Sequence, residues 1–271
     1  MFPQLFHLGS YAVPTYGVLV ALGVLVGLWI SVRNSARQGI NRENAWDLGI
    51  AVVLAGILGS KILYVILDWR TGNAFGSNLR EIFSLSTLQA GGVFSGGLIA
   101  GFATAAWYLR KHHMPALATA DGFAPGLALG HAIGRLGCFA AGCCYGKQTH
   151  HFWGVTFTSG VARDNAGTPL NIPLEPTQLI ESAAELGIFI LLSWMFSRKK
   201  FDGQILGAYF FLYGIARFLI EFLRDDPGRG GPYFGGVLSG TQLIAVGLVL
   251  TGGLLWYVRP ASKVVVAPAT R

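Results

Sequence analysis

The segment GRLGCFAAGCCYGKQ, residues 134–148, ends a long apolar run and gathers the most unusual residues of the chain. It contains Arg135 and all three cysteines of the sequence, Cys138, Cys143 and Cys144, among four glycines. The C-x4-C-C spacing does not match the paired C-x2-C ligands of a structural zinc site. Three interpretations stay open: a zinc site, a disulfide from the first cysteine to one of the adjacent pair, and small apolar residues that pack against the glycines.

The composition around this segment is that of a membrane protein. Of the 271 residues, 52% are hydrophobic and 12% are charged, whereas about 25% are charged in an ordinary soluble domain. A membrane-spanning helix needs about 20 largely apolar residues. Seven such segments are predicted, at residues 15–33, 47–67, 89–108, 119–137, 178–196, 205–223 and 237–258. We therefore predict an all-α integral membrane protein with one polytopic domain over residues 1–271.

Lysine and arginine are distributed unevenly over the predicted loops. One side has eleven of them, three in residues 33–42, two in 110–111, three in 198–200 and three in 259–271, whereas the other loops have six. Because positive residues are retained in the cytoplasm, the N-terminus is predicted outside and the C-terminus inside. The net charge of +7 is then explained by the orientation of the chain in the membrane and does not indicate a nucleic-acid partner. The loop at about 138–177 becomes a small extracytoplasmic cap, in which FWGVTF is a candidate strand.

Spans three and four are rich in glycine, as in QAGGVFSGGLIAG (residues 89–101) and DGFAPGLALGHAIGRLG (residues 121–137). Two interpretations follow. Small residues let helices approach closely, or the backbone is broken or re-entrant, which a membrane protein tolerates only around an enclosed cavity. Asp121, at the start of span four, is interpreted as the N-cap of that helix.

Ionisable residues within membrane spans are costly and indicate function by default. In span six, Arg217 and Glu221 are four residues apart and share one helix face with Arg224. They form either a self-neutralising pair or a cationic face for a phosphate, which arginine binds through its planar fork. The topology places Arg135 and Arg217 toward the outer side, where a phospholipid headgroup is the expected ligand. His131, one turn before Arg135, is interpreted as a core residue.

Several blocks together resemble the prolipoprotein diacylglyceryl transferase family. They are GRLGCFAAGCCYG, GGVFSGGL, EPTQLIE at the start of span five, RFLIEFLR in span six, Tyr16-Gly17, and SGTQL before span seven. Their order and spacing fit the family from about residue 14 to residue 258. The resemblance implies a bacterial inner-membrane enzyme with seven spans and an extracytoplasmic N-terminus.

The activity implied is transfer of the diacylglyceryl group of phosphatidylglycerol to the lipobox cysteine of a preprolipoprotein. The product is a thioether, glycerol phosphate leaves, and no metal or cofactor is needed. Arg135 and Arg217 resemble the pair that binds the headgroup and stabilises the departing phosphate, with Glu221 orienting Arg217. The rest of the substrate-binding wall is assigned to Tyr16, Gln89, Gln178, Glu181 and Arg224.

The sequence departs from the family pattern at Ser95, where many members have a histidine proposed to assist thiol deprotonation. Serine is a poor base, so either Glu221 or Glu181 assists, or the histidine is not an obligatory base. Cys138 and Cys143 stand where members commonly have asparagine and glutamate, and Glu175 where they have histidine.

Three further functions stay open as alternatives. They are a divergent paralogue that acts on another lipid or acceptor, an anion or lipid transporter with a cation-lined cavity, and a thiol-redox membrane enzyme that uses the three cysteines. The sequence has no detectable inverted repeat, which disfavours the transporter.

Overall fold

The computed structural model describes residues 3–8, 11–71, 93–225, 232–233 and 238–258. The chain divides into two compact units: residues 40–116 form the smaller one, and residues 1–39 together with 117–271 form the larger one. The smaller unit contains α2 (Arg42–Thr71) and α5 (Phe94–Lys111). The helices of the larger unit are α1 (Thr15–Arg37), α6 (Ala116–Ala141), α7 (Gly160–Ala166), α8 (Thr177–Phe196), α9 (Gln204–Ile220), the 3₁₀ turn η1 (Glu221–Leu223) and α10 (Gly240–Val258).

Five helical segments are long and apolar enough to cross a membrane. They are Thr15–Arg37, Arg42–Leu67, Thr177–Phe196, Gln204–Leu223 and Gly240–Val258. Each of the seven predicted spans overlaps a described helix, so the predicted all-α class is confirmed for the described residues. The chain is therefore a multi-pass membrane protein. That α5 and α6 also cross the membrane, and which side faces out, stay predictions.

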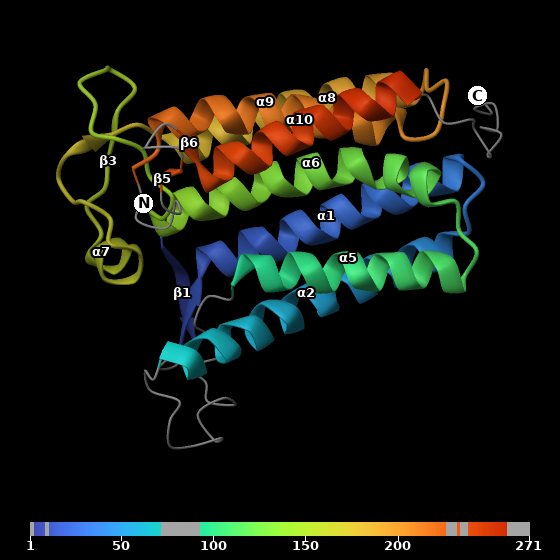
Figure 1. The fold of residues 1–271 in the computed structure, drawn as a ribbon. Coiled ribbons are helices and arrows are strands. Elements are labelled where there is room, and N and C mark those ends of the chain that lie inside the picture. Colours follow the sequence, from blue (N-terminus) through green and yellow to red (C-terminus); the bar gives the residue numbers. More distant parts are fainter. Residues whose placement is uncertain (1–2, 9–10, 72–92, 226–231, 234–237, 259–271) are drawn as a thin grey trace. The chain divides into compact units, whose positions relative to one another are not determined.

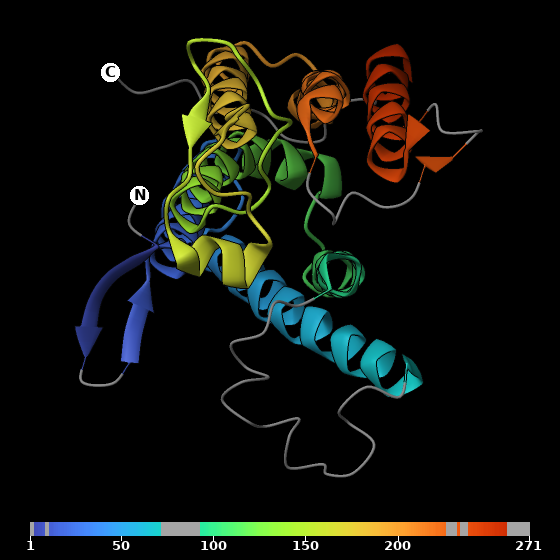
Figure 2. The same cartoon turned by 90° about the vertical axis from the view of Figure 1, so that its left-hand side faces the viewer.

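In the larger unit, α8, α9 and α10 pack side by side, and α8 and α9 also pack against α6. In Figures 1 and 2, α9 lies between α8 and α10, and α6 and α9 run in the same direction along the unit. Ala124 and Ala128 of α6 are fully buried against Leu192 of α8 and Ile205 of α9. Because these α6 residues are small, the larger apolar side chains of α8 and α9 fill the space beside that helix.

Glycines allow α1 and α6 to touch through their backbones. A Cβ added to Gly27 would lie 2.6 Å from the carbonyl oxygen of Gly126, and one added to Gly23 would lie 2.7 Å from that of Gly130. The α6 backbone is helical throughout, including at Pro125. The close-packing interpretation of the glycines is therefore confirmed here, and the broken-backbone interpretation of span four is wrong.

The smaller unit uses glycine in the same way. A Cβ on Gly59 of α2 would lie 2.6 Å from the carbonyl oxygen of Gly96 of α5, and one on Gly97 would lie 2.8 Å from that of Gly56. Over Phe94–Lys111 the α5 helix is continuous. Close helix packing, and not a re-entrant segment, explains the glycines in this part of span three.

Asp121 does not cap its own helix, which begins five residues earlier. Its fully buried carboxylate instead accepts hydrogen bonds from the backbone N–H groups of Gly203, Ile205 and Leu206, at 2.7 to 2.9 Å. The N-cap prediction is therefore wrong about the helix, because Asp121 caps α9 and not α6. A carboxylate at this position also complements the positive end of the α9 dipole.

Lys199 completes this buried cluster, which we call the inner charge cluster after the side on which the predicted topology places it: Asp121, Lys199, Asp202 and Gln38. The ammonium group of Lys199 lies 2.9 Å from Asp121 and 2.8 Å from Asp202, and it also donates to the side-chain oxygen of Gln38. The Gln38 amide donates in turn to the carbonyl of Ala118, at 2.9 Å. These contacts join α1, α6 and the α8–α9 connection.

The segment between α6 and α8, residues 142–176, folds into a small cap, and α6 continues to Ala141, beyond residue 138 where the loop was predicted to begin. Strand β3 (Val155–Thr156) pairs antiparallel with β4 (Pro173–Leu174), and α7 lies between them in sequence (Figure 1). Tyr145, Phe157 and Leu174 form the apolar core of the cap. The candidate strand FWGVTF thus contains β3. The other short strands of the larger unit are β1 (Gln4–Leu8) with β2 (Tyr11–Pro14), and β5 (Pro232–Tyr233) with β6 (Leu238–Ser239).

Candidate active site

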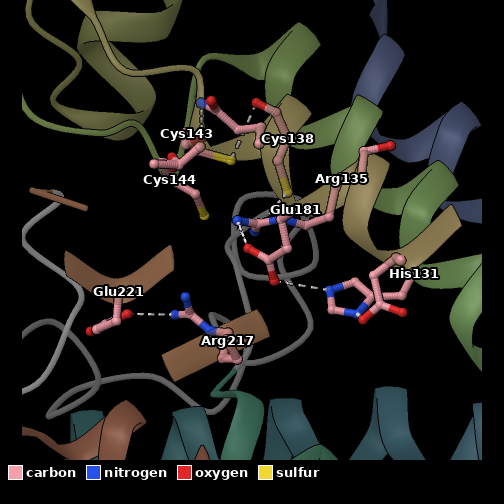
Figure 3. A network of polar contacts seen from close by, with 12 residues as sticks. His131, Arg135, Cys138, Cys143, Cys144, Glu181, Arg217 and Glu221 are labelled. Carbon is pink, nitrogen blue, oxygen red and sulfur yellow. Dashed lines mark hydrogen bonds and ion pairs between the residues drawn. The ribbon is translucent and has the colours of Figure 1, made fainter. Parts of the chain in front are cut away.

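Arg135 lies in the last third of α6 and is 7% exposed. Its Nη2 atom lies 2.5 Å from Glu181 Oε2, so α6 and α8 meet through a buried ion pair. The pair is charge-assisted, and Glu181 is 3% exposed. Arg135 and Glu181 were both predicted site residues, and the structure brings them together (Figure 3).

A histidine extends this pair along α8. Nε2 of His131 lies 3.5 Å from Glu181, and its Nδ1 lies 2.8 Å from Glu185, which is one turn further along the same helix. The His131 side chain is 31% exposed, whereas both carboxylates are buried. His131 is therefore held by two carboxylates in the site and is not the core residue that the sequence suggested.

Arg217 and Glu221 form the intrahelical pair that their spacing predicts, with Nη2 of Arg217 2.9 Å from Glu221 Oε2. Arg217 is in the last turn of α9, and Glu221 begins η1, where the helix tightens. The other carboxylate oxygen of Glu221 accepts a 2.9 Å hydrogen bond from the hydroxyl of Ser239. Glu221 is fully buried and is held by Arg217 and Ser239 through its two oxygens, so it fixes the position of the Arg217 guanidinium.

Figure 3 shows the two arginines in one polar network, with Glu181 and His131 on the Arg135 side and Glu221 beside Arg217. Tyr213 of α9 interacts electrostatically with both arginines and with Glu181. Its ring lies edge-to-face against His131, with centroids 5.4 Å apart. The sequence therefore placed the two cations correctly in one region. We call this region the outer charge cluster, after the side on which the predicted topology places it: His131, Arg135, Glu181, Glu185, Arg217 and Glu221.

Not every donor in this cluster is used. Nε of Arg135 and Nη1 of Arg217 are buried, and within the described parts of the chain neither has a hydrogen-bond partner. A buried polar group without a partner costs about 1–3 kcal/mol, and more when it is charged. Two guanidinium groups with spare N–H donors in one network therefore form a potential binding site for an anion with several oxygen atoms.

Two glycines of the segment after α6 are required by the backbone itself. Gly142 has φ +82°, in the left-handed region, directly after the helix ends at Ala141. Gly146 lies between two chain segments, and a Cβ there would be 2.6 Å from Cβ of Glu175 and 2.7 Å from the carbonyl oxygen of Leu223. Gly146 thus allows one extended segment to bond to both the start of α8 and the end of η1.

The adjacent cysteines are held by the first turn of α8. The hydroxyl of Thr177 donates to the carbonyl of Cys144 at 2.8 Å, and the amide of Gln178 donates to the carbonyl of Cys143 at 2.7 Å. All three cysteines are free, so the disulfide interpretation is not seen here. Hydrogen bonds from the Cys138 and Cys143 thiols lower the pKa of the Cys144 thiol.

The other predicted site residues are distributed around this region or lie elsewhere. Tyr16 packs against Gly137 and is near enough to Arg135 to interact electrostatically. Arg224 follows η1, is 8% exposed, and forms a β-bridge with Gly146. Ser95 has an exposed side chain in the first turn of α5, in the smaller unit. Gln89 lies outside the described residues.

His131, Glu185 and Tyr213 lie in this network but are not among the predicted site residues, although all three are polar residues within predicted spans. Helical spacing identifies them as neighbours of the predicted site residues, because His131 precedes Arg135 by four residues and Glu185 follows Glu181 by four. Tyr213 likewise precedes Arg217 by four. Each missed residue therefore lies one helical turn from a residue that was identified, on the same face.

Known proteins resemble this chain over almost its whole length. Residues 3–258 match the family described as Prolipoprotein diacylglyceryl transferase. The phosphatidylglycerol--prolipoprotein diacylglyceryl transferase 2 of Clostridium perfringens is 34% identical over 254 residues, covering 94% of this chain and 92% of that protein. The Clostridium tetani transferase is 34% identical over 256 residues, covering 93% of this chain and 95% of its own, and a Vibrio cholerae transferase is 32% identical over 257 residues, covering 93% and 89%. The family match and these relatives show that the chain belongs to the prolipoprotein diacylglyceryl transferase family.

Proposed function

We propose that this protein transfers the diacylglyceryl group of phosphatidylglycerol to the lipobox cysteine of a preprolipoprotein, and that the outer charge cluster is its active site. The observation that carries the proposal is the pair of buried arginines with unpartnered donors, Nε of Arg135 and Nη1 of Arg217. Membership of the family supports the reaction class. The relatives' names supply phosphatidylglycerol and prolipoprotein as the two substrates.

The proposed topology has seven spans in the bacterial inner membrane, with the N-terminus outside. The uneven distribution of lysine and arginine supports this orientation. It places the outer charge cluster and the cap on the extracytoplasmic side. Phosphatidylglycerol then enters laterally from the outer leaflet, and the signal peptide reaches the same site from the membrane.

In the proposed reaction, the peptide thiolate attacks the carbon of the diacylglyceryl group that carries the phosphate. A carbon–sulfur bond forms, the carbon–oxygen bond to the phosphate breaks, and the electron pair leaves with glycerol phosphate. Arg135 and Arg217 bind the phosphate in the ground state and neutralise the charge that grows on its departing oxygen. Glu221 and Glu181 hold the two guanidinium groups in position at 2.9 Å and 2.5 Å.

We assign the proton acceptor for the thiol to His131. Glu181 and Glu221, the carboxylates that the sequence offered, are each already paired with an arginine, whereas the His131 side chain is 31% exposed. The Nδ1 contact of 2.8 Å with Glu185 orients the ring and stabilises the imidazolium formed when the thiol proton is taken up. The proton therefore moves from the peptide sulfur to His131.

The test is a reconstituted assay. Purified protein is mixed with phosphatidylglycerol labelled in its acyl chains and with a peptide carrying a lipobox cysteine, and the peptide is analysed by mass spectrometry. We expect a mass increase equal to one diacylglyceryl group, on the cysteine sulfur, with one glycerol phosphate released per product. A peptide with serine in place of that cysteine is the matched control. Release of glycerol phosphate without peptide modification, or movement of labelled lipid without chemistry, would contradict the proposal.

A further inference from the structure

The three cysteines of the chain form a cluster that the transferase chemistry does not use. The Sγ atoms of Cys138, Cys143 and Cys144 all lie within 4.8 Å of one another. Three thiolates bound to one ion at about 2.3 Å have their sulfur atoms about 4.0 Å apart when the ion lies in their plane. Small rotations of the three side chains are enough to shorten the sulfur–sulfur separations to this value.

The cluster is built by the turn after α6 and not by sequence spacing alone. Gly142 and Cys144 both have positive φ, +82° and +60°. The left-handed conformation is unfavourable for a residue with a side chain, by about 1–2 kcal/mol. The carbonyls of Cys143 and Cys144 are bound from behind by Gln178 and Thr177, as described above. These hydrogen bonds hold the turn that directs two adjacent sulfurs toward Cys138, although the C-x4-C-C spacing matches no common zinc pattern.

Two cationic side chains lie near the cluster. Nη1 of Arg135 lies 3.8 Å from the Cys138 sulfur, and Arg224 is near enough to Cys144 to interact with it electrostatically. Three thiolates with one monovalent cation carry a charge of −2. The two guanidinium groups offset part of that charge, since Arg135 is also paired with Glu181.

We propose that Cys138, Cys143 and Cys144 form a three-coordinate binding site for Cu⁺. Thiolate ligands select soft ions such as Cu⁺ and Zn²⁺. Structural Zn²⁺ takes four protein ligands, but among the described residues no histidine or carboxylate joins the three sulfurs in one group. Cu⁺ forms stable complexes with three thiolate ligands. Binding replaces three S–H bonds by three Cu–S bonds, releases three protons and needs no oxidant. Binding of the ion requires neither lipid nor peptide.

The test is anaerobic titration of the full chain in detergent, purified without a polyhistidine tag. Cu⁺ is supplied as its complex with bicinchoninate, whose colour reports transfer of the ion to the protein. We expect one Cu⁺ per chain, a shell of sulfur neighbours only in X-ray absorption at the copper edge, and protection of three thiols from alkylation. Each single variant, Cys138→Ser, Cys143→Ser and Cys144→Ser, should bind at least about tenfold more weakly, because two thiolates remain.

His150→Ala is the matched control, since it removes an exposed side chain of the cap that could bind copper non-specifically. It should leave stoichiometry and affinity unchanged. Thiol protection is measured on the unmodified chain, so the proposal can be judged even if a cysteine variant does not fold. Binding that survives replacement of all three cysteines would overturn it, as would unprotected thiols at full occupancy. Equal affinity for Zn²⁺ with a nitrogen or oxygen neighbour would overturn the assignment to Cu⁺.

Discussion

Two buried charge clusters lie toward opposite ends of α6, and they differ in how completely their groups are paired. In the inner charge cluster, Asp121 accepts three backbone hydrogen bonds and one ion pair, and Lys199 contacts two carboxylates and an amide. In the outer charge cluster, both arginines retain buried donors without a hydrogen-bond partner in the described residues. Buried charge is costly in both places. Complete pairing is suited to holding helices together, whereas incomplete pairing leaves capacity for a ligand.

The largest effect is expected from breaking the complete cluster. Asp121→Ala leaves the buried Lys199 ammonium with one carboxylate less and removes the cap of α9. Loss of one partner of a buried ion pair costs about 3–5 kcal/mol. Thermal unfolding in detergent, followed by circular dichroism, should show a clearly lower midpoint. The control Asp164→Ala removes an exposed ion pair and should leave the midpoint unchanged. Equal midpoints for both variants would contradict a structural role of the inner charge cluster.

Breaking the incomplete cluster should affect activity more than stability. Arg135→Gln removes a donor set directed at the phosphate, and loss of one such electrostatic contact lowers turnover by about 10²–10³-fold. Arg135→Lys should recover little of it, because lysine lacks the planar fork. Turnover is measured in the reconstituted assay at matched amounts of folded protein. Arg163→Gln, at an exposed arginine of the cap, is the control, and a comparable loss there would argue against a specific site.

A smaller loss is expected when the proposed proton acceptor is removed. His131→Gln keeps a polar side chain between Glu181 and Glu185 but cannot take up the thiol proton, and general-base contributions are about 10²–10⁴-fold; we expect the lower end, because the nearby arginines still favour the thiolate. The loss should diminish as the assay pH rises and the peptide thiol ionises unaided. A pH-independent loss would mean that His131 only positions its neighbours.

The smallest effect is expected at Ser95. A serine hydroxyl is a poor base near neutral pH, so Ser95→Ala should change turnover by less than about threefold. Ser95→His tests the same point in the opposite direction, since it introduces the residue common in the family. A large loss of turnover in Ser95→Ala would indicate a catalytic role for Ser95 and would weaken the assignment of the proton acceptor to His131.

The sequence predicted helices better than it predicted their contacts. Apolar runs located the long helices of the described residues to within about five residues, because a run long enough to cross a membrane is readily recognised in a sequence. The pair Arg217–Glu221 was also predictable, since both residues are on one helix. Asp121 was misassigned because it bonds across helices, to a backbone more than eighty residues away. The cysteine cluster was equally hidden, because its assembly depends on positive φ values that no spacing rule encodes.

Asp121 has one more consequence, which concerns the level of the two arginines along the bundle. It lies on α6 fourteen residues before Arg135, and it binds the N–H of Gly203, which lies fourteen residues before Arg217. At 1.5 Å per residue both guanidinium-bearing positions are about 21 Å beyond the same carboxylate, on helices that run in the same direction (Figure 1). A single side chain thus sets the register between two helices. Under the proposed function, the level at which the two arginines bind phosphate is therefore set by helix geometry relative to Asp121, and a bilayer of different thickness has to be accommodated by tilting of the helices or by a local change of bilayer thickness.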